Sequence, residues 1–112
     1  MNAILALLQE SDTLVIASPV YYLGFPGSLK MLIDRTYAES AIGRKITASI
    51  LLTTACNKEE HVTNVMIQYY RALTNYIGWK NLGVISAKGV DAPGEIENHP
   101  SLEETFQLGL HI

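Results

Sequence analysis

The stretch that decides the fold runs from Asp12 to Tyr37 and reads DTLVIASPVYYLGFPGSLKMLIDRTY. Residues 14–17 form a nearly continuous apolar run, which is typical of a parallel strand covered on both faces. Pro19 cannot donate a ladder hydrogen bond and therefore predicts the end of a strand over 13–17. Apolar residues return at helical spacing from Leu29 to Thr36. The stretch predicts a strand, an irregular loop and a helix.

The loop within this stretch lies at the carboxyl end of the predicted strand. Gly24, Pro26 and Gly27 mark it, because glycine and proline punctuate turns. In an open α/β sheet, ligands bind in the crevice outside the carboxyl ends of the strands. Residues 18–24 are therefore the first place to look for a site, although a strand-to-helix turn with no ligand would use the same residue types.

The rest of the chain alternates in the same way. Outward from this stretch we expect a helix over 2–10, a strand over 45–54, a helix over 59–77 ended by Gly78, a strand over 82–87 and a short last helix to Gly109. Ser101 and Glu104 form a capping-box pattern before that last helix. The pattern predicts one α/β domain over residues 1–112, with a parallel sheet and helices on both faces.

Composition excludes several functional classes. The chain has 112 residues, 48% of them hydrophobic and 17% charged, with a net charge of −3. Its eight basic residues are scattered, so we expect no nucleic-acid partner. No apolar run approaches the ~18 residues that cross a membrane, and no secretory leader opens the chain, which predicts a cytoplasmic protein with no membrane partner. Cys56 is the single cysteine, so neither an internal disulfide nor a metal site is expected.

Two motifs carry a resemblance to a known family. The run Ser18-Pro19-Val20-Tyr21 is followed by Gly27-x-Leu29-Lys30-x-x-Ile33-Asp34-Arg35. This sequence resembles the flavodoxin-like NAD(P)H-dependent FMN reductases, together with the related iron–sulfur flavoproteins and flavodoxin-type quinone reductases. The resemblance implies a flavodoxin-like parallel sheet, here reduced to about three strands, which match strands 3, 4 and 5 of the family's order 2-1-3-4-5.

The resemblance also identifies what this sequence lacks. The family's first β-α-β portion, whose first loop holds the FMN phosphate, has no counterpart, so the domain is interpreted as N-terminally truncated. The strand over 13–17 would then have a bare apolar edge, which favours a homo-oligomer. The cysteine cluster of the iron–sulfur flavoproteins is absent as well, and we expect no iron–sulfur centre.

By resemblance, FMN is the implied cofactor and NAD(P)H the implied co-substrate. The implied FMN contacts lie in the loops after the first two strands: Ser18, Pro19, Val20, Tyr21, Tyr22, Gly24, Thr54, Ala55 and Cys56. Tyr21 and Tyr22 either stack on the flavin ring or pack at a subunit contact. The second loop is equally a capped turn with Asn57 as N-cap, and Cys56 is expected to be an inert, partly buried thiol. The three histidines share no metal spacing and are interpreted as surface or packing residues.

Two functions compete. In the first, the protein is an FMN-binding oxidoreductase that passes hydride or electrons from NAD(P)H through FMN to a small acceptor such as a quinone. The flavin carries that chemistry, so no catalytic acid or base is nominated. In the alternative, the chain is a truncated non-catalytic module that has lost stable FMN binding and acts as an oligomeric domain. Loss of the phosphate contacts would weaken FMN binding by roughly three orders of magnitude.

Overall fold

A computed structural model describes residues 2–39 and 45–112. Within them the elements are α1 (Asn2–Glu10), β1 (Thr13–Pro19), α2 (Gly27–Glu39), β2 (Ala48–Ala55), α3 (Glu60–Ile77), β3 (Lys80–Lys88) and α4 (Pro100–Leu110). The predicted alternation of helices and strands is confirmed. Most of the connection that we expected between α2 and β2 lies outside the described residues.

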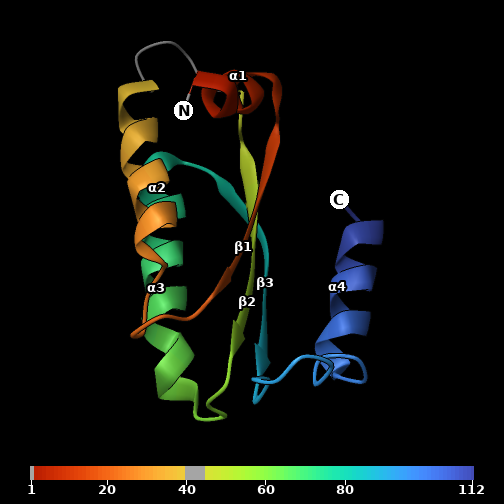
Figure 1. The fold of residues 1–112 in the computed structure, drawn as a ribbon. Coiled ribbons are helices and arrows are strands. Elements are labelled where there is room, and N and C mark those ends of the chain that lie inside the picture. The colour runs from red at the N-terminus through yellow and green to blue at the C-terminus, as the bar shows by residue number, and fades with distance from the viewer. Residues whose placement is uncertain (1, 40–44) are drawn as a thin grey trace.

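The three described strands form one parallel sheet in the order β1-β2-β3 (Figure 1). Thr13 lies opposite Ala48 in the first pair, and Ile50 lies opposite Gly83 in the second. Because all strands run the same way, their carboxyl ends reach one edge of the sheet. This edge carries the loops considered below as the candidate site.

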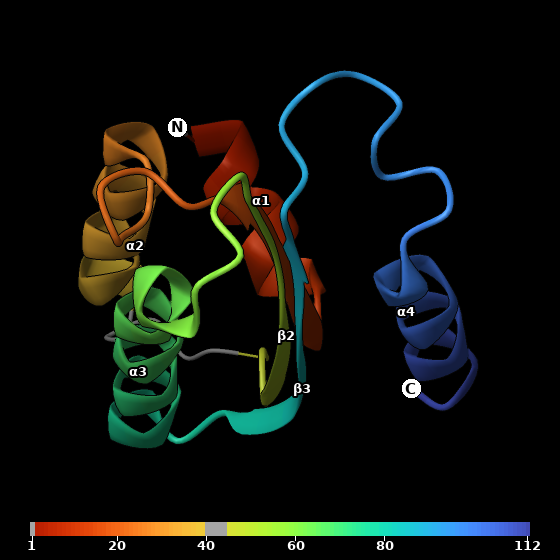
Figure 2. The ribbon, with the colours of Figure 1, turned by 90° about the horizontal axis from the view of Figure 1, so that it is seen from below.

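The helices are divided unequally between the two faces of the sheet. α2 and α3 lie side by side on one face, and α4 lies on the other (Figure 2). The core forms on the α2–α3 face, where Ile16, Leu51, Met66 and Tyr70 are buried in one cluster. Val20, Phe25 and Leu29 pack against this cluster and so join the first strand-end loop to the core.

The prediction that the first strand is covered on both faces is wrong. Leu14 and Ile16 face the core, but Val15 is 48% exposed, and Ala17 and Pro19 on the same side are also exposed. The reason is the position of α4, which packs on β3 and not on β1. A Cβ at Gly83 of β3 would come within 2.8 Å of Leu108 Cδ2, so this glycine gives the helix its close approach.

The strand bounds differ from the predicted ones for backbone reasons. β1 continues to Pro19 because the odd-numbered residues of this strand, Pro19 among them, turn their backbone groups away from β2. The N–H of the next residue, Val20, bonds Thr54 O at 2.9 Å. A proline therefore costs no ladder bond there. β2 begins at Ala48, three residues later than expected, although Thr47 already bonds both neighbouring chain segments.

The helix ends were predicted with mixed success. Gly78 ends α3 in the left-handed conformation (φ 92°), and its N–H bonds Thr74 O at 2.9 Å, as predicted. The capping box before α4 is wrong. His99 is the N-cap, its Nδ1 accepts the Ser101 N–H at 3.2 Å, and Pro100 occupies the first turn.

The tyrosines of α3 have separate environments. Tyr70 is completely buried, Tyr69 is partly exposed and Tyr76 is exposed. The Tyr70 hydroxyl shares a 2.7 Å hydrogen bond with Ser49 Oγ and donates to Asn81 Oδ1 at 3.3 Å. These bonds join α3 to β2 and β3. Burial raises the pKa of Tyr70 above its ordinary value, and the Ser49 bond opposes that rise.

We predict that Tyr70→Phe lowers the free energy of unfolding by about 1–3 kcal/mol, because the completely buried Ser49 hydroxyl loses its partner. Urea denaturation followed by circular dichroism measures this change. Tyr76→Phe is the matched control, since its hydroxyl belongs to an exposed side chain, and it should leave the unfolding midpoint unchanged. Equal effects of the two changes would contradict the assigned role of the buried bond.

The comparison of the wild type with Tyr70→Phe also gives a prediction for the dependence of stability on pH. The folded state holds the Tyr70 proton more tightly than the unfolded chain, in which the pKa of tyrosine is near 10.0. This contribution to stability is fully present below pH 10 and is lost as the pH rises through the folded-state pKa. The stability difference between wild type and Tyr70→Phe should therefore stay constant below pH 10 and shrink above it. A difference that grows above pH 10 would reverse the sign of the assigned shift.

Candidate functional site

Loops from the ends of all three described strands lie together at one edge of the sheet. Val20, after β1, donates its N–H to Thr54 O of β2 at 2.9 Å. Val90, after β3, donates its N–H to Ala55 O at 3.1 Å. The loop ends are thus held by main-chain hydrogen bonds, which depend on no side chain. We call this arrangement the strand-end site.

The first loop contains a tight and strained turn. Tyr21 and Gly24 exchange two backbone hydrogen bonds, both 3.0 Å long. Between them, Tyr22 (φ 45°) and Leu23 (φ 69°) both have positive φ values. Two consecutive residues of this kind define a type I′ turn, which normally uses Asn and Gly. Residues held in unfavourable backbone regions cluster at ligand clamps and active sites, so this turn is a functional candidate.

The turn displays its side chains while its base is anchored. Tyr22 is fully exposed, and Tyr21 and Leu23 are exposed as well. Phe25 packs edge-to-face on Tyr69 of α3, with ring centroids 5.6 Å apart. A cavity of about 310 Å³ lies between the turn and α3. Val20, predicted as a flavin contact, packs its side chain on the core instead and can offer a ligand mainly its backbone.

The second loop presents residues of two kinds. Thr54 and Cys56 are exposed, whereas Ala55 is buried. The expectation of a partly buried Cys56 is therefore wrong, because this residue lies in the bend beyond the covered end of β2. Asn57 is not the helix N-cap, which is Glu59. Its Oδ1 accepts the Glu59 N–H at 2.8 Å and orders the turn that precedes α3.

A shallow groove of about 620 Å³ extends from the strand-end site over the α4 face of the sheet. Pro19 and Thr54 line its end nearest the loops, and Leu102 and Phe106 line it from α4. Ser18 also borders the groove, but its hydroxyl donates to Pro19 O at 2.8 Å. The groove is mostly apolar, which suits a planar organic ligand better than a highly charged one.

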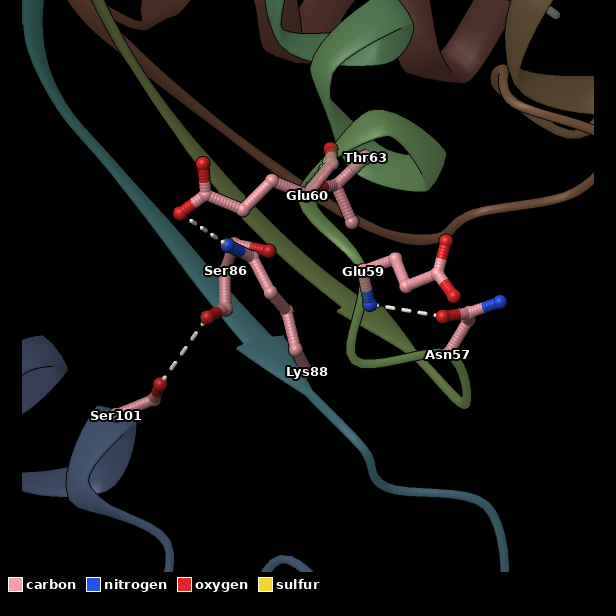
Figure 3. Close-up of polar contacts among 7 residues, drawn as sticks. All are labelled: Asn57, Glu59, Glu60, Thr63, Ser86, Lys88 and Ser101. Carbon is pink, nitrogen blue, oxygen red and sulfur yellow. Dashed lines mark hydrogen bonds and ion pairs between the residues drawn. The ribbon is translucent and has the colours of Figure 1, made fainter.

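The sequence analysis did not include the end of β3 in the site, and Figure 3 shows the contacts of Lys88 with Glu60 and of Ser86 with Ser101. Lys88, the last residue of β3, forms an ion pair with Glu60 of α3 at 3.5 Å. Its carbonyl oxygen lies 3.0 Å from His99 Nε2. Ser101 Oγ donates to Ser86 O at 3.4 Å, while the buried Ser86 Oγ has no hydrogen-bond partner among the described residues. Lys88 directly follows the strand predicted over 82–87. The site residues of the other two loops were identified from the same position after a strand, so this signal was available for Lys88 as well.

The charged groups near the first loop are compensated. Lys30 lies beside the turn and bonds Asp34 one helical turn along α2, and this hydrogen bond raises the pKa of Lys30.

In the described ranges 2–39 and 45–112, no cluster of three or more His, Cys, Asp or Glu side chains has a geometry for a metal ion. Over the same ranges, no helix has both the length and the apolarity of a membrane span.

Comparisons with known proteins agree with this architecture. A profile of the family described as flavodoxin-like fold matches residues 1–107. An iron-sulfur flavoprotein from Archaeoglobus fulgidus is 31% identical over 116 residues, covering 100% of this chain and 50% of that protein. An FMN-dependent NADH:quinone oxidoreductase from Francisella philomiragia is 31% identical over 120 residues, covering 95% of this chain and 61% of that protein. The chain spans only about half of the first relative's length.

Solved structures show the same fold. The Trp repressor binding protein from Bacillus subtilis superposes with a TM-score of 0.81 at 17% identity, covering 96% of this chain and 74% of that one. A thermophilic tryptophan halogenase from Streptomycin violaceusniger gives a TM-score of 0.70 at 21% identity, covering 98% and 71%. At such identities the likeness establishes the arrangement of helices and strands and nothing about chemistry.

The strained turn generates a prediction. Tyr22→Gly should keep or raise the free energy of unfolding, by up to about 1 kcal/mol, because glycine adopts positive φ without steric cost and the fully exposed ring buries nothing. Tyr21→Gly is the matched control. It should lower the free energy of unfolding by about 0.5–1 kcal/mol, since glycine loses more backbone entropy on folding. Thermal or urea unfolding compares the two, and equal destabilisation would argue against strain at Tyr22.

Proposed function

The chain belongs to the flavodoxin-like family, and on this basis we propose that it binds FMN at the strand-end site as an oxidoreductase. The resemblance of the Ser18–Tyr21 and Gly27–Arg35 motifs to the FMN reductases and related flavoproteins is confirmed at the level of the family. Hydride would pass from NAD(P)H to FMN and onward to a small acceptor such as a quinone.

The observation that carries this proposal is that a backbone hydrogen bond holds the first two loops together. The 2.9 Å bond from Val20 N to Thr54 O holds the tyrosine-bearing turn against the end of β2. Exposed Tyr21 and Tyr22 on one side and exposed Thr54 and Cys56 on the other are thereby kept at one edge of the sheet. Aromatic rings, backbone amides and a mostly apolar groove are the surroundings that a planar ring requires.

The residues present fit the ring of FMN better than its phosphate. Near the strand-end site, Lys30 is paired with Asp34, Lys88 is paired with Glu60, and Lys58 packs its alkyl chain over Gly89. The proposal therefore assigns the ring to these loops and assigns no phosphate contact.

FMN supplies the ability to accept a hydride and to release electrons singly or in pairs. The chain's own contribution would be positional and electrostatic. Tyr21 and Tyr22 would cover a face or an edge of the ring, and the rigid turn would hold backbone N–H groups at a constant position beside it. The half-buried base of the loop, packed on the core through Val20 and Phe25, would keep these groups from moving when the ring changes charge.

The names of the relatives suggest which acceptor and which donor to test for the proposed reaction. The Francisella philomiragia protein is named as an FMN-dependent NADH:quinone oxidoreductase, which makes a quinone the first acceptor to assay. The groove of about 620 Å³ reaches the strand-end site and is open and apolar, as a small planar acceptor would need. Either NADH or NADPH would serve as the donor in the proposed reaction.

We predict that titration with FMN quenches flavin fluorescence and shifts the visible flavin bands at tens of micromolar or below. Tyr22→Ala should weaken this binding about two- to tenfold, because an aromatic stacking contact contributes about 0.5–1.5 kcal/mol. Tyr76→Ala is the matched control, as this tyrosine is exposed on α3 and belongs to no part of the site. Its FMN affinity should equal that of the wild type.

The outcome separates the two functions considered for this chain. Perturbed flavin bands together with NAD(P)H oxidation in the presence of a quinone support the oxidoreductase. A flat titration, with neither quenching nor a spectral change, would sink the proposal and favour a non-catalytic module. Equal weakening by Tyr22→Ala and Tyr76→Ala would show that FMN binds elsewhere on the protein.

A further inference from the structure

The cavity of about 310 Å³ beside the tyrosine-bearing turn opens on the face of the molecule where α2 and α3 lie side by side (Figure 2). Its lining comes from the loop after β1, the first turn of α2 and the first half of α3, within residues 22–30 and 65–69. The groove of about 620 Å³ lies on the α4 face and shares no lining residue with this cavity. The cavity is therefore a separate feature, and its walls include no residue of β1.

Two aromatic rings and a sulfur atom give the cavity apolar walls. Phe25 packs edge-to-face on Tyr69, with ring centroids 5.6 Å apart and an interplanar angle of 71°. Met66 is completely buried, and its Sδ accepts a hydrogen bond from Thr53 Oγ1 at 3.4 Å, which fixes the position of this side chain. Ring edges and a thioether are favourable neighbours for another aromatic ring. Since an apolar cavity of about 150 Å³ holds benzene, this cavity has room for a ring with a substituent.

Lys30 supplies hydrogen-bond donors at the rim of the cavity. Its ammonium group has three N–H groups, of which one bonds Asp34 Oδ1. The Lys30 side chain is 46% exposed, so its other N–H groups can reach a ligand. Because Asp34 balances the charge of Lys30, an anionic ligand would meet a carboxylate as well as the ammonium. A neutral carbonyl oxygen can accept a hydrogen bond from Lys30 without that repulsion.

The strained turn forms the wall of the cavity that lies across from α3. Tyr22 and Leu23 have φ values of 45° and 69°, and both side chains line the cavity. Leu23 remains 41% exposed, so packing in the core does not explain why a leucine occupies this unfavourable conformation. Strain of this kind is found at ligand clamps. The turn therefore supplies a rigid wall at the place where a bound ring would need one.

We propose that this cavity binds a small, planar, neutral aromatic compound that carries a carbonyl oxygen. The ring would lie between Leu23 and Val65, against the pair formed by Phe25 and Tyr69. The carbonyl oxygen would accept a hydrogen bond from Lys30 Nζ. This site is additional to the one proposed for FMN, and it is tested on the protein without flavin, so the two proposals stand or fail separately.

The first test uses methionine methyl groups as reporters of occupancy. In protein labelled with ¹³C at the methionine methyl groups, titration with acetophenone should shift the Met66 resonance saturably, at low millimolar concentration or below. Met31 is the internal control, because it is 70% exposed and lines a different groove, and its resonance should stay in place. An unresponsive Met66 would overturn the proposal, and so would an equal shift of Met31, which indicates non-specific association.

The second test blocks the cavity. Val65 is 51% exposed, so Val65→Trp can be accommodated on the surface of α3 while its ring occupies the proposed site. Acetophenone should then cause no further shift of the Met66 resonance. Ala72→Trp is the matched control, since Ala72 is exposed about two turns further along α3 and outside the lining, and it should bind as the wild type does. Circular dichroism checks the fold of both variants. Undiminished binding by Val65→Trp would place the ligand elsewhere and refute the assignment.

The third test examines the chemical class of the ligand. α-Methylstyrene has the shape of acetophenone, with a CH₂ group in place of the carbonyl oxygen. Lys30→Met should weaken acetophenone binding about two- to tenfold, as expected for the loss of one hydrogen bond, and should leave α-methylstyrene binding unchanged. Benzoate should bind the wild type more weakly than acetophenone does. An equal effect of Lys30→Met on both neutral compounds, or tighter binding of benzoate, would contradict the proposed class.

Discussion

The rest of the structure depends on the parallel pairing of β2 with a strand on each side. β2 lies between β1 and β3, and its Leu51 is completely buried, so both its backbone and its side chains are committed to the fold. Parallel pairing brings the three carboxyl ends to one edge. The bonds from Val20 to Thr54 and from Val90 to Ala55 then extend the ladder beyond the strands and hold the loops. The strand-end site is therefore a consequence of the sheet.

The structure depends next on the unequal distribution of the helices between the two faces of the sheet. α2 and α3 cover one face and create the core, where Tyr70 joins α3 to the sheet through Ser49 and Asn81. α4 can lie close to β3 because Gly83 has no side chain, and the bond from Ser101 to Ser86 O holds it there. The α4 side of β1 consequently stays open, and this opening forms part of the groove beside the strand-end site.

Stability and ligand binding place opposite demands on the first loop. Its base is packed on the core, but its tip holds Tyr22 and Leu23 at positive φ and exposes their side chains. A sequence selected for stability alone would place Asn and Gly in such a turn. The retained tyrosine and leucine are understandable if the tip contacts a ligand, which is the role proposed for it with FMN. The backbone strain is therefore one observation in favour of the flavin proposal.

The sequence by itself determined the order of elements, the end of α3 at Gly78, the parallel class of the sheet and the family motifs around Ser18 and Arg35. These are local properties, set by the period of apolar residues and by the backbone preferences of glycine and proline. Only the tertiary structure decided which faces are covered. A run such as Leu14–Ala17 is apolar whether or not a helix lies over it, so one open face of β1 could not be predicted. The exposure of Cys56, the capping of α4 by His99 and the place of Lys88 in the site likewise depend on contacts between distant segments. Such contacts are set by how the helices pack on the sheet, and no local pattern encodes them.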